Sequence, residues 1–347
     1  MVYPLRIHFV LFAFLVSLAT TGQDVHFSQY GAAPLNINPG FTGQFDGRYR
    51  IMANQRTQWR SVTVPYSTFA FAGDLSSLQY KTRSSGGEKI HTVNDLGLGA
   101  LFLTDKTGDS QLQTTLINVA ASYRIHLSPR DLVIPGVLTG FTFRKIDYSQ
   151  LSYDNQWTGI IYDPGINPNE NFGRDAYTNF NFQMGFLWTH YMSQNKLESG
   201  MGIYHLSLPG QSFFNNPSVT LDPRITLHST LTLELNPTWT LEPSFLFMSQ
   251  GKFTEFDLGA TAYMAMPSAP FEKHRVFGGV FFRTRDAGFL VAGLEYDAWR
   301  AGLSYDFNLS GLRPASNGRG GLELSLSYII DWPPSVSGYK KYCPDYM

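Results

Sequence analysis

The most constraining feature of this chain is a regular alternation of apolar and polar residues near its C-terminal end. Two segments, 298–309 and 321–330, carry an apolar residue at every second position, including Trp299, Leu303, Phe307, Leu322, Leu324 and Leu326. Side chains of a β-strand point alternately to opposite faces, so each segment is predicted to be a strand with one apolar and one polar face. A buried sandwich gives the same alternation, but segments of ten or more residues favour a bilayer crossing over a globular strand of about five or six.

Alternating segments bounded by turn residues continue along most of the chain and predict about fourteen strands. They lie at 47–56, 64–75, 94–104, 111–127, 131–147, 177–192, 196–206, 225–235, 238–248, 252–264, 274–285, 287–296, 298–309 and 320–331. An unpaired sheet edge has no water to bond with in lipid, so such a sheet has to close. The predicted fold is an all-β transmembrane antiparallel barrel of about 14 strands spanning 47–332.

The connections between these strands separate into two kinds when they are assigned alternately to the two sides of a barrel. One side holds the long connections 148–176, 207–224 and 310–319, plus several short turns. The other side holds the tight connections 128–130, 193–195, 236–237 and 296–298, together with longer pieces at 76–93 and 265–273. Short periplasmic turns and longer outer loops are typical of bacterial outer-membrane barrels, so the asymmetry favours that class over a soluble sandwich.

The ends of the chain carry features of their own. Residues 1–22 combine a cationic start, an apolar run too short to span a bilayer and small residues before Gly22, which predicts a secretory signal peptide. Residues 23–46 lack clean alternation and are predicted to be a plug or periplasmic segment, because about fourteen strands enclose a lumen too wide for wall side chains to fill. We expect 333–347 to be a periplasmic tail.

Composition excludes several other classes of protein. Only 15% of residues are charged and 15% are aromatic, which fits a lipid-facing band between aromatic girdles. After the leader no stretch of 18 apolar residues remains, so a helical membrane protein is not expected. A net charge of −1 offers no electrostatic basis for nucleic-acid binding, and the single Cys343 cannot form an internal disulfide framework.

One segment is specific enough to indicate a family. Positions 23–43 read QDVHFSQYGAAPLNINPGFTG, followed by Tyr49-Arg50, by NQRTQW at 54–59 and by Asp74. This opening resembles the PorP/SprF family of outer-membrane proteins associated with type IX secretion and gliding motility, with Val25 in place of the usual Pro and Gly40 in place of the usual Ala. A second stretch, Tyr204-His205-Leu206 followed by Pro209 and Ser212-Phe213, and a tail with Tyr342-Cys343-Pro344 are also similar to the family.

The N-terminal motif supplies the candidate partner or plug residues. They combine turn formers with apolar anchors, and they are Phe27, Ser28, Gln29, Pro34, Asn36, Asn38, Pro39, Phe41, Thr42 and Gly43. Two interpretations are compatible: the segment packs inside its own barrel, or part of it faces the periplasm and binds secretion partners.

No arrangement of residues predicts an enzyme, a metal site or a cofactor. His205 and Ser207 have the spacing of an outer-membrane phospholipase pair, but they lie at a strand end before a Pro-Gly turn, so we expect a structural role. Isolated histidines such as His26 and His228 are expected to make hydrogen bonds in the lumen or plug. The loop 154–175 places aromatic and aliphatic residues among turn formers, and it either forms a protein-binding surface or folds back over the barrel mouth.

The sequence therefore predicts a non-enzymatic barrel in the outer-membrane lipid. The resemblance implies a role in delivering or anchoring secreted cargo proteins, with periplasmic secretion-system or peptidoglycan-linked proteins as neighbours. The alternatives are a porin-like diffusion channel and a barrel-embedded hydrolase that uses His205 and Ser207.

Overall fold

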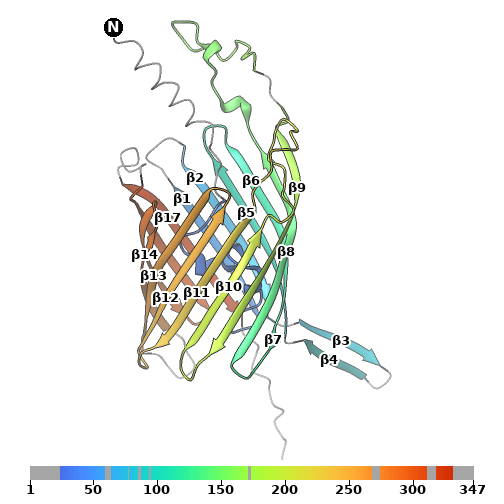
Figure 1. Ribbon diagram of the computed structural model, residues 1–347, viewed down its shortest axis with the longest axis vertical. Helices are drawn as coiled ribbons and strands as arrows, with labels where there is room; N and C mark the ends of the chain where they lie inside the picture. Colours follow the sequence, from blue (N-terminus) through green and yellow to red (C-terminus); the bar gives the residue numbers. More distant parts are fainter. Residues whose placement is uncertain are drawn as a thin grey trace, which may run out of the picture.

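The computed structural model describes residues 24–58, 64–76, 78–84, 87–93, 95–170, 173–267, 274–310 and 318–330. The predicted signal peptide and the tail 333–347 lie outside the described residues and stay predictions. Fourteen strands form one antiparallel barrel (Figure 1). They are β1 (Tyr49–Gln58), β2 (Tyr66–Leu75), β5 (Leu96–Thr107), β6 (Leu112–Tyr123), β8 (Asp131–Lys145), β9 (Ala176–Tyr191), β10 (Lys196–Tyr204), β11 (Arg224–Glu234), β12 (Trp239–Gln250), β13 (Phe253–Ala265), β14 (His274–Arg283), β15 (Ala287–Tyr296), β16 (Trp299–Asn308) and β17 (Arg319–Ile330).

The barrel is closed between its first and last strands. Strand β1 pairs with β17 from Tyr49 opposite Ile330 to Gln58 opposite Gly321, and it also pairs with β2. The remaining strands pair with their neighbours in chain order, with β6 joined to β8. The predicted fold class and strand number are thus confirmed. Among the described residues no helix is long and apolar enough to cross a membrane, a finding that does not bear on strands.

Three short strands were not expected. Residues 76–93, predicted as a plain connection, contain a hairpin made by β3 (Leu78–Ser84) and β4 (Gly87–Val93), which points away from the barrel at its lower end (Figure 1). The predicted strand 111–127 ends at Tyr123, and β7 (Ile125–His126) then pairs with β8. Each strand of the hairpin has only seven residues and carries charged side chains such as Lys81 and Lys89, so the hairpin lacks the long apolar alternation of the barrel strands.

The wall of the barrel is apolar outside, whereas its inner face carries charged and polar side chains together with some apolar ones. Large apolar side chains are exposed along its strands, for example Ile117 at 52% and Val280 at 66%. Charged side chains are buried instead, with Arg56 and Glu323 each at 1% exposure. A soluble protein cannot maintain this inverted arrangement, because it leaves a continuous apolar band in water and hides charges. The outer surface is therefore one that contacts lipid, and the protein is located in the outer membrane.

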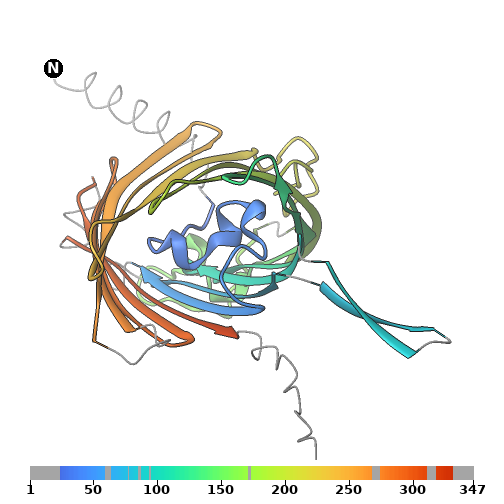
Figure 2. The ribbon, with the colours of Figure 1, turned by 90° about the horizontal axis from the view of Figure 1, so that it is seen from below.

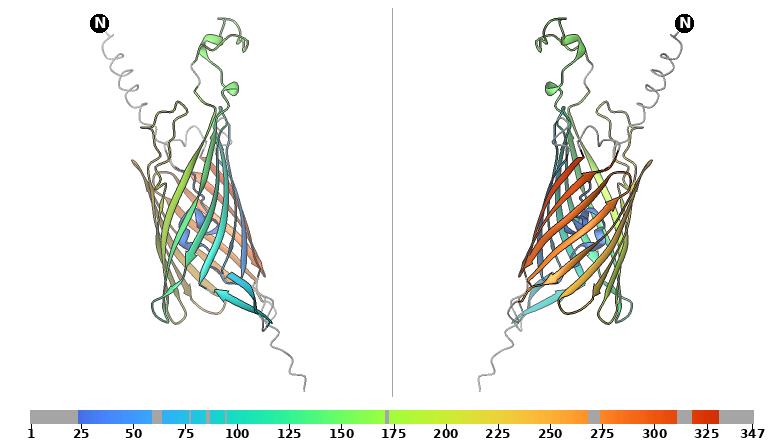
Figure 3. Two further views of the ribbon diagram at one scale, coloured as in Figure 1. Left: turned by 90° about the vertical axis from the view of Figure 1, so that its right-hand side faces the viewer. Right: turned by 90° about the vertical axis from the view of Figure 1, so that its left-hand side faces the viewer.

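The connections retain the expected asymmetry in part, since the outer end also has the short β12–β13 and β14–β15 turns and the opposite end has the long β2–β5 connection. The β8–β9 connection, 146–175, rises well above the barrel and contains the short 3-10 helices η4 (Tyr148–Gln150) and η5 (Asp154–Gln156) (Figures 1 and 3). The β10–β11 connection, 205–223, is at the same end. At the opposite end β9–β10, β11–β12 and β15–β16 are joined by at most four residues each. We call the long-loop end the outer rim and the short-turn end the periplasmic rim.

Candidate functional site

The candidate site is the lumen, which the N-terminal segment occupies. Residues 24–46, called the plug here, contain three single-turn 3-10 helices, η1 (Tyr30–Ala32), η2 (Pro34–Asn36) and η3 (Pro39–Phe41). Viewed along the barrel in Figure 2, these turns lie in blue within the ring of strands. Helices this short leave most of their backbone N–H and C=O groups without a hydrogen-bond partner in the same helix. The plug therefore depends on hydrogen bonds from the barrel wall.

The plug begins near the outer rim. The carboxylate of Asp24 lies 2.5 Å from His205 Nε2 and 3.2 Å from Arg224 Nη1, and the Asp24 amide donates to Gln250 Oε1 at 2.9 Å. Burial raises the pKa of Asp24, but the charges of His205 and Arg224 outweigh it and hold that pKa well below its usual range. The start of the plug is thus held at the ends of β10, β11 and β12, by ion pairs with His205 and Arg224 and by a hydrogen bond to Gln250.

The next residues, Phe27-Ser28-Gln29, are bound by a buried charged pocket. The amides of Ser28 and Gln29 donate to the two carboxylate oxygens of Glu323, at 2.8 and 2.9 Å. The Ser28 hydroxyl lies 2.8 Å from both carboxylate oxygens of Asp306. The Gln29 side chain bonds to Ser325, whose Oγ donates to Gln29 Oε1 at 2.7 Å. Two β17 residues and one β16 residue therefore recognise both backbone and side chains of this motif.

Two arginines pair with the carboxyl groups of this pocket. Arg56 donates to Asp306 Oδ2 at 2.9 Å and to the carbonyl of His26 at 2.8 Å. Arg283 is fully buried and lies 3.2 Å from both Asp257 and Glu255. Burial lowers the pKa of His26 well below its usual range, and the charges of Arg283 and Arg56 lower it further, so this imidazole is neutral. Because the charges are paired across the five strands β1, β13, β14, β16 and β17, removing one partner leaves another buried without compensation.

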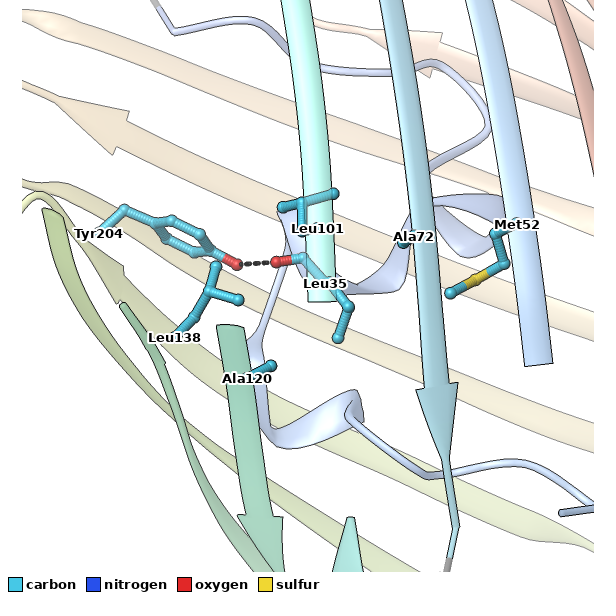
Figure 4. Packing of buried hydrophobic residues seen from close by; sticks show 7 residues of the cluster. All are labelled: Leu35, Met52, Ala72, Leu101, Ala120, Leu138 and Tyr204. Atoms are coloured by element: carbon cyan, nitrogen blue, oxygen red, sulfur yellow. Dashed lines mark hydrogen bonds between the residues drawn. The ribbon is translucent and has the colours of Figure 1, made fainter. Parts of the chain in front are cut away.

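The middle of the plug packs against apolar side chains that point inward. Leu35 is the centre of a cluster from six strands, comprising Leu35, Met52, Ala72, Leu101, Ala120, Leu138 and Tyr204 (Figure 4). The Tyr204 hydroxyl donates to the Leu35 carbonyl at 2.8 Å. The Thr226 hydroxyl donates to the Ile37 carbonyl at 2.6 Å, and Arg224 donates to the Asn36 carbonyl at 2.9 Å. The wall therefore satisfies the plug carbonyls that the short helices leave free.

The turn Asn38-Pro39-Gly40 packs closely against the backbone of the barrel wall. Asn38 Oδ1 accepts the Gly40 amide at 2.8 Å, while its Nδ2 donates to the Phe186 carbonyl at 2.8 Å. A side chain on Gly185 of β9 would collide with Asn38, and one on Gly136 of β8 would lie 2.5 Å from the Pro39 carbonyl. Wall glycines at these two positions let the turn approach the sheet backbone directly.

The plug leaves the lumen near the periplasmic rim. Gly43 has a φ of +68°, and its amide donates to Asp74 Oδ2 at 2.7 Å. Arg50 binds the same carboxylate through Nε and Nη2, at 3.0 and 2.7 Å. Ser122 donates to the Thr42 carbonyl at 2.6 Å, and Arg124 donates to the Gly43 carbonyl. These bonds fix the chain where it turns into β1.

A cavity of about 450 Å³ remains on the periplasmic side of the plug. Its lining includes Tyr263, Arg275, Glu295 and Arg300 from β13 to β16. Both arginines contact Glu295, each at 2.5 Å, and Arg300 donates to the Tyr263 hydroxyl at 3.1 Å. The lumen is therefore filled around the plug and hollow beneath it.

The structure brings the ten sequence-predicted residues together in the lumen, where they make different kinds of contact. Phe27 packs against Ala33, Ala70 and Leu103, and the Phe41 ring lies 4.8 Å from that of His228, measured between centroids. Pro34 and Pro39 begin η2 and η3. The wall residues that bind them, such as Asp306 and Glu323, were not singled out as site residues, although both lie on the polar faces of strongly alternating strands.

His205 and Ser207 do not form a pair with each other. Strand β10 ends at Tyr204, two residues before the predicted end, because His205 has a φ of +59°. His205 Nε2 is bound to Asp24, whereas the Ser207 hydroxyl donates to the Phe180 carbonyl at 2.8 Å. The two side chains lie beyond the end of the strand and bind different partners, so they do not have the arrangement of an outer-membrane phospholipase pair. Among the described residues no group of His, Cys, Asp or Glu side chains suits a metal ion.

Comparison with solved structures finds other outer-membrane barrels. The toluene transporter TbuX of Ralstonia pickettii is 11% identical, with 86% of this chain and 93% of that chain covered and a TM-score of 0.47. The toluene transporter TodX of Pseudomonas putida is 10% identical, with 89% and 95% covered and a TM-score of 0.48. A search among curated proteins returns no significant match.

Comparison with protein families gives a specific result. Residues 19–328, which include the whole plug and nearly the whole barrel, match the family described as type IX secretion system membrane protein PorP/SprF. The motif residues quoted for the resemblance, among them Arg50, Arg56, Asp74 and Tyr204, are wall residues that hold the plug. The chain belongs to the PorP/SprF family of type IX secretion system membrane proteins.

Proposed function

We propose that this protein is a non-enzymatic platform of the type IX secretion machinery, which helps to deliver or anchor secreted proteins at the cell surface. The observation that best supports this proposal is the plug, which is bound by strands all around the barrel. A segment held by buried ion pairs and by backbone contacts is costly to displace. The lumen is then a structural core, and the two rims are the surfaces that remain for partners.

The two rims offer different surfaces. At the periplasmic rim the β3–β4 hairpin forms its own two-stranded sheet, so each strand has a backbone edge that is not paired within that sheet. Such an edge can accept a strand of a second protein, which suits a periplasmic secretion-system or peptidoglycan-linked partner. At the outer rim the long loops 146–175 and 205–223 would face secreted cargo.

The proposed platform role can be tested by measuring the surface display of secreted cargo in living cells. Deletion of the gene should abolish surface display of type IX cargo, and the intact gene should restore it. Removal of residues 78–93 should reduce cargo display while leaving a folded barrel, as shown by heat-dependent migration in gel electrophoresis. Normal display in both strains would contradict the proposal.

A diffusion channel is the second candidate, and the 450 Å³ cavity is the observation that favours it. The two are separated by single-channel recording in planar bilayers. A plugged platform should show no steady conductance until residues 24–42 are removed. Because that deletion also removes barrel contacts, a full-length variant with Glu323→Ala and Asn38→Ala provides a second, milder test. Large steady conductance of the intact protein would favour the channel.

A further inference from the structure

The tip of the β8–β9 loop exposes apolar side chains far from the barrel. Trp157, Ile160, Ile161 and Tyr162 are exposed at 57%, 85%, 62% and 42%. In Figures 1 and 3 this loop, coloured green, rises well beyond the outer rim. Adjacent apolar residues at such exposure are unfavourable in water unless another surface covers them.

The tip is an ordered structure. Trp157 and Tyr162 form a β-bridge, and the Thr158 amide donates to the Ile161 carbonyl at 3.0 Å. Gln156 is buried beneath the bridge, where its Oε1 accepts the Tyr162 hydroxyl at 2.8 Å and its Nε2 donates to the Ile166 carbonyl at 3.0 Å. These bonds fix the backbone that carries Ile160 and Ile161, so little conformational entropy is lost when a partner binds.

The base of the loop is fastened to the neighbouring outer loop. The Arg174 guanidinium donates to the Ser212 carbonyl at 2.8 Å and lies 4.5 Å above the centre of the Tyr177 ring. The Tyr177 ring in turn packs edge-on against Phe213, with ring centres 4.8 Å apart. The loop therefore projects from a braced base.

The charge of the loop indicates what covers the tip. Between 147 and 175 there are five acidic residues, Asp147, Asp154, Asp163, Glu170 and Asp175, and one basic residue, Arg174, a net charge of −4. Asp154 and Asp163 flank the apolar tip, whereas Arg174 is engaged at the base. An acidic projection is repelled by anionic lipid headgroups and attracts a basic protein surface.

We propose that residues 157–162 form a docking knob for a secreted protein whose surface carries an apolar recess flanked by lysine or arginine side chains. Ile160 and Ile161 enter the recess of the partner, and Asp154 and Asp163 pair with the lysine or arginine side chains that flank this recess. This inference rests on the outer rim facing the cell exterior, as in the proposed function, and it adds the site and the chemistry of the partner.

The knob is tested by photo-crosslinking in living cells. A photoreactive amino acid replaces Ile160 in the full-length protein, and the matched control replaces Asn169, an exposed residue on the returning limb of the same loop. Secretion is measured in both strains. The Ile160 position should capture a secreted protein that the Asn169 position does not capture.

The captured protein is then purified and its affinity for the full-length barrel in nanodiscs is measured. The double variant Ile160→Asp, Ile161→Asp should weaken binding about a hundred-fold or more. The variant Asp154→Lys, Asp163→Lys should weaken it about ten-fold, and a Lys→Glu change at the recess of the partner should restore it. Equal capture at both positions, no capture, capture of lipid alone or unchanged affinity would each refute the knob. Normal secretion alongside such a result would leave the platform proposal intact.

Discussion

The two ends of the N-terminal motif are held in the lumen by different physical means. The Phe27-Ser28-Gln29 end is bound by charged side chains, with Glu323 and Asp306 accepting hydrogen bonds at about the same distance of 2.8 to 2.9 Å. The Asn38-Pro39-Gly40 end lies directly against the backbone of the wall. The wall has glycine at positions 136 and 185, where any larger residue would collide with the turn. Binding of the Phe27-Ser28-Gln29 end therefore depends on charged wall side chains. Binding of the Asn38-Pro39-Gly40 end depends on the space that the wall glycines leave.

This difference means that the two ends should respond to different substitutions. Buried charges are sensitive to removal of a partner, since the remaining charge keeps its desolvation cost. A shape-fitted turn is sensitive to added volume. Amide hydrogen exchange of peptides within 24–46, measured by mass spectrometry on detergent-purified protein, reports the local opening free energy at each end separately.

The largest effect is expected from Glu323→Ala. This change removes the acceptor for the Ser28 and Gln29 amides and leaves Arg56 with one fewer counter-charge. The opening free energy of residues 26–30 should fall by about 3–5 kcal/mol, whereas residues 38–43 should change less. The control Glu234→Ala removes an exposed carboxylate at the periplasmic rim and should leave both ends unchanged. An equal response at the two ends would show that the plug opens as one unit.

Gly185→Val should produce the opposite pattern. The new side chain collides with Asn38, so residues 38–43 should lose about 1–3 kcal/mol of protection while residues 26–30 are less affected. Gly278→Val is the matched control on β14, because Gly278 is exposed on the lipid face and its nearest neighbouring atom is 3.8 Å away. If both valines have the same effect, the fit of the turn to the wall is not the cause.

A smaller effect is expected from Asn38→Ala. Loss of its bonds to Gly40 and Phe186 should lower protection of residues 38–43 by about 1–2 kcal/mol. Asn36→Ala serves as the neighbouring control, since its side-chain nitrogen has no hydrogen-bond partner among the described residues. Similar losses in both variants would contradict a specific role for the Asn38 amide.

The smallest effect concerns pH at the start of the plug. Because the folded state holds the pKa of Asp24 below its ordinary value of 3.8, the carboxylate stabilises the plug fully above that pH. This stabilisation is lost as the pH falls through the lower folded-state pKa. Exchange at residues 24–26, corrected for intrinsic rates, should therefore be constant from pH 7 to 5 and rise only in acid below about pH 4. Asp24→Asn should remove that rise, and a rise near pH 6 would point to another group.

Much of the barrel could be predicted because its signal is local. Each predicted strand agrees with an observed one within a few residues, since exposure to lipid on one face and to the lumen on the other imposes alternation. The β3–β4 hairpin was missed because a sheet outside both environments needs no such pattern. The end of β10 was misplaced because His205 adopts a left-handed conformation, which the alternation does not signal, and binds Asp24, which is 181 residues away.

The sequence by itself determined the strand number, the two kinds of rim and the family, because periodicity, turn residues and a short motif are all properties of neighbouring positions. Only the tertiary structure decided how the motif is used. Ser28 meets Glu323 across 295 residues, and Asn38 meets the Phe186 carbonyl across 148. Such contacts form when the sheet closes into a cylinder, since closure brings the polar faces of distant strands around one segment, and no local pattern encodes which of those faces it will touch.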